Sequence, residues 1–140
     1  MQFTRGGYMH ITTPVSDELV RYLNLSGLQL KLTAQNMANV DTPGYRTVGF
    51  DFAEEMQRSM AEALAEREST RQNRSKFLTQ SAPVAVKQVD GLLERPDGNN
   101  VSIDREGVKM AEAQLQFRTG VELLKSEFTR VLDAIHEDSK

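Results

Sequence analysis

The stretch that decides the fold is NMANVDTPGY, residues 36–45, because it ends a long leucine-rich segment with a proline–glycine pair. Pro43 disfavours the α conformation at Thr42, so a helix cannot continue through this point. Pro and Gly at the two central positions of a four-residue turn favour a type II turn, which places Gly44 at positive φ. We therefore predict that a helix ends near residue 39 and that a tight turn follows it.

The residues before this turn have the periodicity of one long amphipathic helix over residues 16–39. Thr13 offers a capping hydroxyl, and Asp17 and Glu18 place negative charge at the helix start. Two adjacent lines of apolar residues follow at helical spacing: Leu19, Leu23, Leu30 and Met37 in the first, and Leu25, Leu28 and Leu32 in the second. Such a broad apolar face predicts burial against other helices.

A second long helix is predicted over residues 102–136, after a strong turn signal at residues 95–100. Asn100 or Ser102 provides its N-cap. Apolar positions then step alternately by four and three residues through Met110, Gln114, Phe117, Val121, Leu124, Phe128, Val131 and Ile135. This heptad pattern predicts a coiled-coil-like contact. Gly120 lies beside the line, where it could admit a close neighbour.

The segment between the two helices has a different character. Charges of both signs alternate over residues 53–82, which predicts a solvent-exposed helix at 53–67 and a loop-like or disordered stretch at 69–81. The valines at positions 84–89 suggest a short extended stretch. The expected fold class is mainly all-α, and the chain divides into a flexible leader, an N-terminal helix with its turn, a charged middle segment and a C-terminal heptad helix, at residues 1–15, 16–45, 46–100 and 101–140.

Composition excludes several classes of protein. The 140 residues carry a net charge of -3, 39% of them are hydrophobic, and there is neither Cys nor Trp. Without Cys there is no disulfide framework, thiolate zinc site or cysteine nucleophile. No stretch approaches the ~20 apolar residues of a membrane span, and residues 1–13 lack the apolar core of a secretory signal. Glutamates interleave with the arginines, which argues against a face that binds nucleic acid.

No constellation of catalytic or metal-ligating residues stands out. His10 and His136 lie near opposite ends of the chain, and no serine or acidic motif surrounds either of them. Residues 97–108 begin like a calcium loop, but Ser102 and Val108 stand where that loop needs Gly and Glu. Glycine-rich nucleotide-binding motifs are absent. We expect no enzymatic activity, no metal and no cofactor.

The stretch at residues 36–45 closely resembles the signature of bacterial flagellar rod and hook proteins, in which an N-terminal helix ends in Asn-apolar-Ala-Asn and Thr-Pro-Gly-Tyr follows. Only Met37 departs slightly, since Ile or Leu is usual there. The short length and the segments 50–55 and 98–117 resemble a proximal rod member. The resemblance covers about residues 16–56 and 96–136, and the motif positions are Asn36, Ala38, Asn39, Thr42, Pro43, Gly44 and Tyr45.

This resemblance implies a structural subunit without catalysis. Such proteins pass unfolded through the flagellar type III export apparatus, without a cleaved signal peptide, and assemble helically in the periplasm as the basal-body rod that transmits torque. Their terminal helices pair antiparallel and pack nearly along the axis of the tube. The implied partners are further copies of the chain, the rod proteins FlgC, FlgF and FlgG, the rod–ring adaptor FliE, the MS-ring protein FliF and the export gate.

Both apolar stripes are expected to form the assembly interface, because a chain this lean in apolar residues cannot bury them alone. We therefore expect low helicity in the isolated chain and a gain on assembly. The family also suggests an export element of the form Phe-xxx-apolar. Phe52 with Met56 matches it, but two other phenylalanines match too, and packing explains Phe52 equally well. The interface residues are Leu19, Leu23, Leu30, Met37, Met110, Phe117, Val121, Leu124, Phe128, Val131 and Ile135.

Other interpretations use the same stripes. Periodicity alone fits an ordinary helical hairpin core. A cytoplasmic helical adaptor or export chaperone that binds a partner helix is the alternative function, although it gives no role to the turn at residues 42–45. An enzyme is a distant third.

Overall fold

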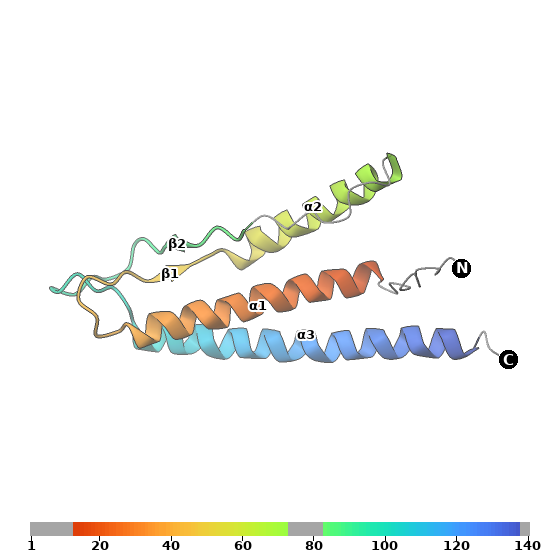
Figure 1. The fold of residues 1–140 in the computed structure, drawn as a ribbon. Helices are drawn as coiled ribbons and strands as arrows, with labels where there is room; N and C mark the ends of the chain where they lie inside the picture. Colours follow the sequence, from red (N-terminus) through yellow and green to blue (C-terminus); the bar gives the residue numbers. More distant parts are fainter. Residues whose placement is uncertain (1–12, 73–82, 138–140) are drawn as a thin grey trace, which may run out of the picture.

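The chain folds into helices joined at one end by a loop region that contains a small sheet (Figure 1). The structure is a computed structural model that describes residues 13–72 and 83–137. Within these ranges the elements are α1 (Pro14–Ala38), β1 (Val48–Gly49), α2 (Phe52–Gln72), β2 (Lys87–Gln88) and α3 (Ile103–Glu137). The mainly all-α fold class predicted from the sequence is confirmed.

α1 begins at a capping box. The Thr13 hydroxyl accepts a hydrogen bond from the Ser16 N–H at 3.0 Å, and the Ser16 hydroxyl accepts one from the Thr13 N–H at 2.9 Å. Two backbone N–H groups without helical partners are thereby satisfied. Pro14 occupies the first turn, where its missing N–H has no consequence. The helix therefore starts at Pro14 rather than at residue 16, and it ends at Ala38 rather than at residue 39.

α3 runs antiparallel to α1 and is the longer of the two (Figure 1). At the loop end the Asn36 side chain donates to Glu106 at 2.9 Å, and at the other end the Thr13 hydroxyl donates to Glu127 at 2.7 Å. Ser102 precedes α3, and its carbonyl accepts from the Glu106 N–H at 3.0 Å. The antiparallel pair of terminal helices that the family resemblance implies is present.

α2 packs on α1 and diverges from it toward its C-terminal end (Figure 1). The rings of Tyr22 and Phe52 meet edge to face, with centroids 5.4 Å apart. α2 continues to Gln72, so the loop predicted from residue 69 is wrong for residues 69–72, because no Gly or Pro ends the helix earlier. The remainder of that predicted loop, like nearly all of the leader, lies outside the described residues.

The small sheet joins the two halves of the middle segment. β1 pairs antiparallel with β2, so that Val48 lies opposite Gln88 and Gly49 opposite Lys87. The extended stretch expected at positions 84–89 therefore exists as β2, while β1 was not predicted. Two-residue strands are too short to produce an alternating pattern in the sequence.

The core is small. Among the described residues the buried apolar side chains are Leu25, Leu32, Ala63, Val101 and Ala113. Leu25 and Leu32, from the second apolar line of α1, share a helix face with Asn36, whose side chain bonds β1. Leu23, from the first line, lies against Gly120 of α3. Leu23 of the first line thus faces α3, whereas the face of the second line carries Asn36, which bonds both β1 and α3.

Candidate assembly interface

The turn after α1 has the geometry predicted for it. The Tyr45 N–H donates to the Thr42 carbonyl at 3.2 Å, and Gly44 has a φ of 72°. A positive φ at the third position is what a type II turn requires, so this prediction is confirmed. The Gly44 N–H donates in turn to the Asp97 carbonyl at 2.8 Å. The turn is therefore held against the loop that precedes α3.

Gly44→Ala should destabilise the chain by about 1 kcal/mol, because an L-residue is strained at positive φ. No atom lies within 4 Å of an added Cβ at this position, so the cost is conformational and not steric. Gly44→Asn should lose less, since Asn tolerates the left-handed region. Urea unfolding in trimethylamine N-oxide, which favours the folded state, followed by circular dichroism, measures both variants. Equal stability of the Ala variant and the parent chain would contradict the assigned strain.

Asn36 is the centre of the polar cluster at this end of the helix pair. It is 1% exposed. Its amide nitrogen donates to the Val48 carbonyl at 2.8 Å and to the Glu106 carboxylate at 2.9 Å. Its oxygen accepts from the Val48 N–H at 3.0 Å and from the Tyr45 hydroxyl at 3.1 Å. Both donors of the amide are used, and its oxygen has two partners, so one side chain joins α1, the turn, β1 and α3.

The environment of Tyr45 keeps its hydroxyl a hydrogen-bond donor to Asn36. Burial raises the pKa of Tyr45, and the charge of Glu106 raises it further. The Tyr45 hydroxyl therefore stays protonated and remains a donor to Asn36 at neutral pH. Glu106 is 1% exposed, and its second oxygen lies 3.4 Å from the Lys109 ammonium.

Asn99 holds the backbone on the other side of the turn. Its amide nitrogen donates to the carbonyls of Asn39 and Thr42 at 3.0 and 2.8 Å, and its oxygen accepts from the Val101 N–H at 2.8 Å. The Asn99 N–H also donates to the Asp97 carboxylate at 3.0 Å, which lowers the pKa of Asp97. Asn99 thus satisfies two carbonyls beyond the end of α1 and ties them to the start of α3.

Glu55 holds the segment that precedes β2 against α2. Its carboxylate accepts hydrogen bonds from Arg58 and, at 3.3 Å, from the Ala85 N–H. The hydrogen bond from Arg58 lowers the pKa of Glu55 most, and the Ala85 N–H lowers it further. Because the folded state favours the charged form, this contact stabilises the fold above the ordinary pKa of 4.5 and is lost as pH falls through the lower folded value.

We therefore expect Glu55→Gln to lower the free energy of unfolding at pH 7. Below pH 4.5 the same substitution should lower it less. The urea midpoints of parent and variant, measured across that range in sucrose, which favours the folded state, should converge at the acid end. A constant gap between the two midpoints would contradict a stabilising role for the charged form.

The contact between α1 and α3 is centred on a line that the heptad pattern did not indicate. Glu106, Ala113 and Gly120 are spaced by seven residues and are all buried, and Glu127 continues the line half-buried. An added Cβ at Gly120 would lie 2.8 Å from the Leu23 side chain, so the helix backbones approach closely here. The predicted seam on α3 is therefore displaced, because small side chains and not the largest apolar ones permit this approach.

The apolar heptad residues of α3 lie beside this buried line. Val121 and Phe128 each follow one of its residues by one position, which is a rotation of about 100° around the helix. α1 covers only part of them: Phe117 is 39% exposed, Phe128 47% and Ile135 48%. Leu132, on the same face, is 55% exposed. We call this set the α3 strip, and it consists of Phe117, Val121, Phe128, Leu132 and Ile135.

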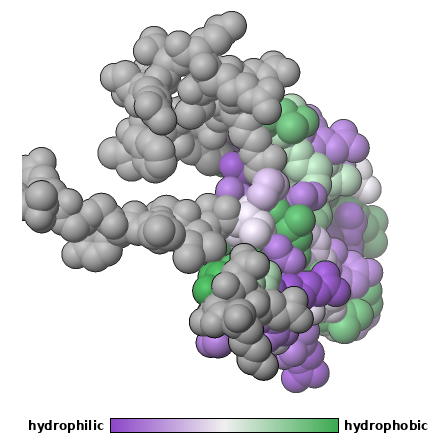
Figure 2. Space-filling view, turned by 90° about the vertical axis from the view of Figure 1, so that its right-hand side faces the viewer, coloured by the Kyte–Doolittle hydropathy of each residue, from purple (hydrophilic) through white to green (hydrophobic). Residues whose placement is uncertain are grey.

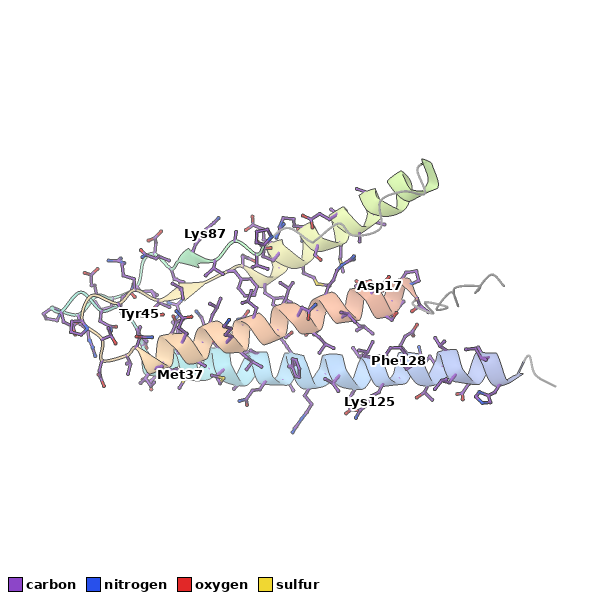
Figure 3. The ribbon with its side chains drawn as sticks, viewed as in Figure 1. Asp17, Met37, Tyr45, Lys87, Lys125 and Phe128 are labelled. Carbon is purple, nitrogen blue, oxygen red and sulfur yellow. The ribbon has the colours of Figure 1, made fainter. Side chains whose placement is uncertain are left out.

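The other predicted interface residues are half-buried. Figure 3 places Met37 and Tyr45 at the loop end of the pair, and Asp17 and Phe128 toward the opposite end. Viewed from the end where the termini lie, hydrophobic patches alternate with hydrophilic ones on the surface (Figure 2). The half-buried set is Leu19, Leu23, Leu30, Met37, Met110, Leu124 and Val131.

The residues of the suggested export element have a packing role. Phe52 contacts Tyr22, and Met56 lines an open groove of about 400 Å³ that Leu19 and Leu123 also line. The described ranges contain no group of side chains suited to a metal ion. None of the helices in those ranges combines the length and apolarity needed to cross a bilayer.

Comparison with known proteins decides the family. No family model matches the chain. It is 30% identical over 119 residues to the flagellar basal body rod protein FlgB of Salmonella typhimurium, across 81% of this chain and 86% of that protein. The chain belongs to the FlgB family. It is also 24% identical over 118 residues to FlgB of Buchnera aphidicola, across 79% and 85% of the two chains, and 24% identical over 122 residues to FlgB of Bacillus subtilis, across 86% and 92%.

The resemblance drawn from residues 36–45 is thereby confirmed and narrowed to FlgB. Among the polar residues that build the loop end, the sequence motif contains Asn36 and Tyr45 but not Glu106, Asn99 or Asn100. Asn100 accepts from the Thr47 N–H at 2.7 Å, and Thr47 is fully buried. The sequence signal for Asn99 and Asn100 is the pair of asparagines shortly before α3, which by itself predicts only a turn and an N-cap.

Proposed function

We propose that this FlgB family member is a structural subunit of the flagellar basal-body rod, and that its helix pair packs lengthwise against the pairs of neighbouring subunits. The observation that carries the proposal is the α3 strip. Antiparallel pairing with α1 leaves Phe128, Leu132 and Ile135 about half exposed. Apolar side chains that recur every three or four residues along one helix face favour burial against another helix.

The loop end cannot supply that burial. Asn36 and Asn99 use their polar groups within the cluster, which fixes the turn beyond α1. In the proposal, neighbouring subunits cover the α3 strip. In the proposed arrangement, residues 16–45 and 101–140 form the packed core of the rod, and the middle segment 46–100 lies outside that core.

The small core also supports export in an unfolded state. Of the described apolar residues only five are buried, two of them alanines. A chain that buries so little is easily unfolded for export, and it gains stability from each neighbour that covers its strip. We propose that the chain leaves the cytoplasm without a cleaved signal peptide, folds on assembly in the periplasm, and transmits torque through helices that lie along the rod axis.

The proposed neighbours are further copies of this chain and the rod proteins FlgC, FlgF and FlgG. At the base of the rod they are the adaptor FliE, the MS-ring protein FliF and the export gate. The proposed contacts are structural, and catalysis has no part in this function.

The test is Leu132→Asp, with Ser126→Asp as the matched control. Both residues are exposed on α3, but Ser126 lies on another face, away from the α3 strip. In the bacterium that encodes the chain, Leu132→Asp should abolish swimming and remove the chain from detergent-extracted basal bodies, with its cellular amount unchanged. Ser126→Asp should behave as the parent chain does.

Normal swimming and normal co-purification of the Leu132→Asp chain would refute the role of the strip. Recovery of the parent chain only from the cytosol, and never with basal bodies, would refute the rod function and favour a cytoplasmic adaptor or chaperone.

A further inference from the structure

We infer that the polar cluster at the loop end, and not the heptad spacing of the large apolar residues, fixes the register of α3 against α1. The cluster consists of Asn36, Asn99 and Glu106. The Asn36 amide and the Glu106 carboxylate are each 1% exposed and 2.9 Å apart across the two helices. A carboxylate buried between two helices demands a partner, and here a single side chain of α1 provides it.

The apolar residues alone do not choose a register. On α3, Met110, Phe117, Leu124 and Val131 follow one another at intervals of seven, and on α1 Leu23, Leu30 and Met37 do the same. Sliding α3 by seven residues, about 10.5 Å, would again bring apolar positions against apolar positions. Heptad contacts of this kind leave several registers close in free energy, and one buried polar residue is a known way to select among them.

The polar contacts do not survive such a shift. In one direction Ala113 would replace Glu106 opposite Asn36, and the carboxylate would lose its donor from α1. Asn36 cannot turn away, because Val48 and Tyr45 hold its other atoms. Lys109 lies on α3 and moves together with Glu106. Their ion pair can therefore form in every register and does not select one.

Two further contacts agree with the register set at the loop end. Asn99 binds the carbonyls of Asn39 and Thr42 only a few residues before α3 begins. Farther along, the space beside Leu23 fits Gly120, and a shift by seven would bring Ala113 or Glu127 there. The register decides how far α3 extends beyond its contact with Thr13, and so where the α3 strip lies along the pair. All these contacts lie within one chain, so the inference does not depend on the proposed rod function.

The absence of native Cys makes the register directly measurable by disulfide trapping. Three reporter chains share Leu23→Cys and differ in the second substitution. Gly120→Cys reports the observed register, because the atoms at these positions are in contact. Ala113→Cys and Glu127→Cys report displacement by seven residues in either direction. Each full-length chain is oxidised in trimethylamine N-oxide, which favours the buried state, and circular dichroism records its helicity.

In otherwise unaltered chains, the reporter of the observed register should cross-link roughly tenfold more than either displaced reporter, as expected when displacement leaves a buried polar group unpaired. Adding Asn36→Leu, Glu106→Leu and Asn99→Ala together should reduce that preference to near parity. Asn36→Leu with Glu106→Leu alone should reduce it part of the way, and this variant keeps an apolar contact between the helices, so it carries the test if the triple variant loses its helicity.

An undiminished preference in the Asn36→Leu and Glu106→Leu chain would overturn the inference, because the apolar contact would then be sufficient. Equal cross-linking of all three reporters in the unaltered background would overturn it as well, since the polar cluster would then select nothing.

Discussion

Gly120→Val should reduce the free energy of unfolding by about 3 kcal/mol, whereas Gly107→Val in the same helix should change it by less than about 0.5 kcal/mol. An added Cβ at Gly120 would lie 2.8 Å from the Leu23 Cδ2 and 3.1 Å from the Tyr22 Cδ1. Atoms this close must move, and the two further methyl groups of Val would separate the helices. An added Cβ at Gly107 meets no atom within 4 Å.

The two substitutions are a matched pair, because each exchanges the same residues within one helix. The gain in helix propensity is therefore equal, and the difference between the variants measures the packing against α1 alone. Urea unfolding in trimethylamine N-oxide, followed by circular dichroism, gives both free energies. Equal effects at the two positions would show that α3 does not approach α1 closely at Gly120. A loss of about 3 kcal/mol is a large part of the 5–15 kcal/mol that stabilises a typical domain.

The close approach at Gly120 also shows where sequence reasoning succeeds and where it stops. Both long helices were predictable, because caps and apolar periodicity are local signals. Thr13 before Pro14 marks the start of α1, and the pair at positions 43–44 marks the turn after it. The placement of Gly120 beside the seam was visible in the sequence. Its position at the centre of the contact was not, because large apolar residues dominate the heptad pattern.

The sequence does not predict the polar cluster, for a different reason. Asn36 and Glu106 are 70 positions apart, and nothing in either local sequence indicates that they meet. Glu106 lies in the first turn of α3, where an acidic residue is favourable whatever its partner, so its place in the sequence does not indicate Asn36. Asn99 was treated as part of a turn. Long-range hydrogen bonds depend on how elements dock, and local patterns contain no such information.

The length of α2 and the presence of β1 also depend on contacts that local sequence patterns do not indicate. The charged residues of α2 suggested exposure, which is compatible with either a helix or a loop. Arg58 bridges Glu55 and Glu62, the latter at 2.9 Å, and such pairs one turn apart support a helix. β1 exists because the Asn36 side chain occupies one edge of Val48 while β2 pairs with the strand.

Asn36→Ala should destabilise the chain by about 4 kcal/mol, more than any other single removal of a polar side chain at the loop end. The substitution deletes four hydrogen bonds. It also leaves the buried Glu106 carboxylate without its donor from α1, and it leaves the N–H and carbonyl of Val48 without the side chain that pairs with them. Asn39→Ala is the control, because its side-chain hydrogen bonds to Gln35 and Thr42 are exposed and water replaces them at a cost of about 1 kcal/mol.

A double-variant cycle separates the two origins of this loss. If the loss of the carboxylate's donor from α1 dominates, Glu106→Leu should restore about 2 kcal/mol of stability when it is added to Asn36→Ala, although Glu106→Leu alone should be destabilising. If lost packing dominates, the two effects should add, and the combined variant should be the least stable of the three. Urea titrations of the four chains in trimethylamine N-oxide, which favours the folded state, distinguish these results. Restoration would mean that the carboxylate requires Asn36, so the motif at residues 36–45 acts on α3 as well as on the turn that follows it.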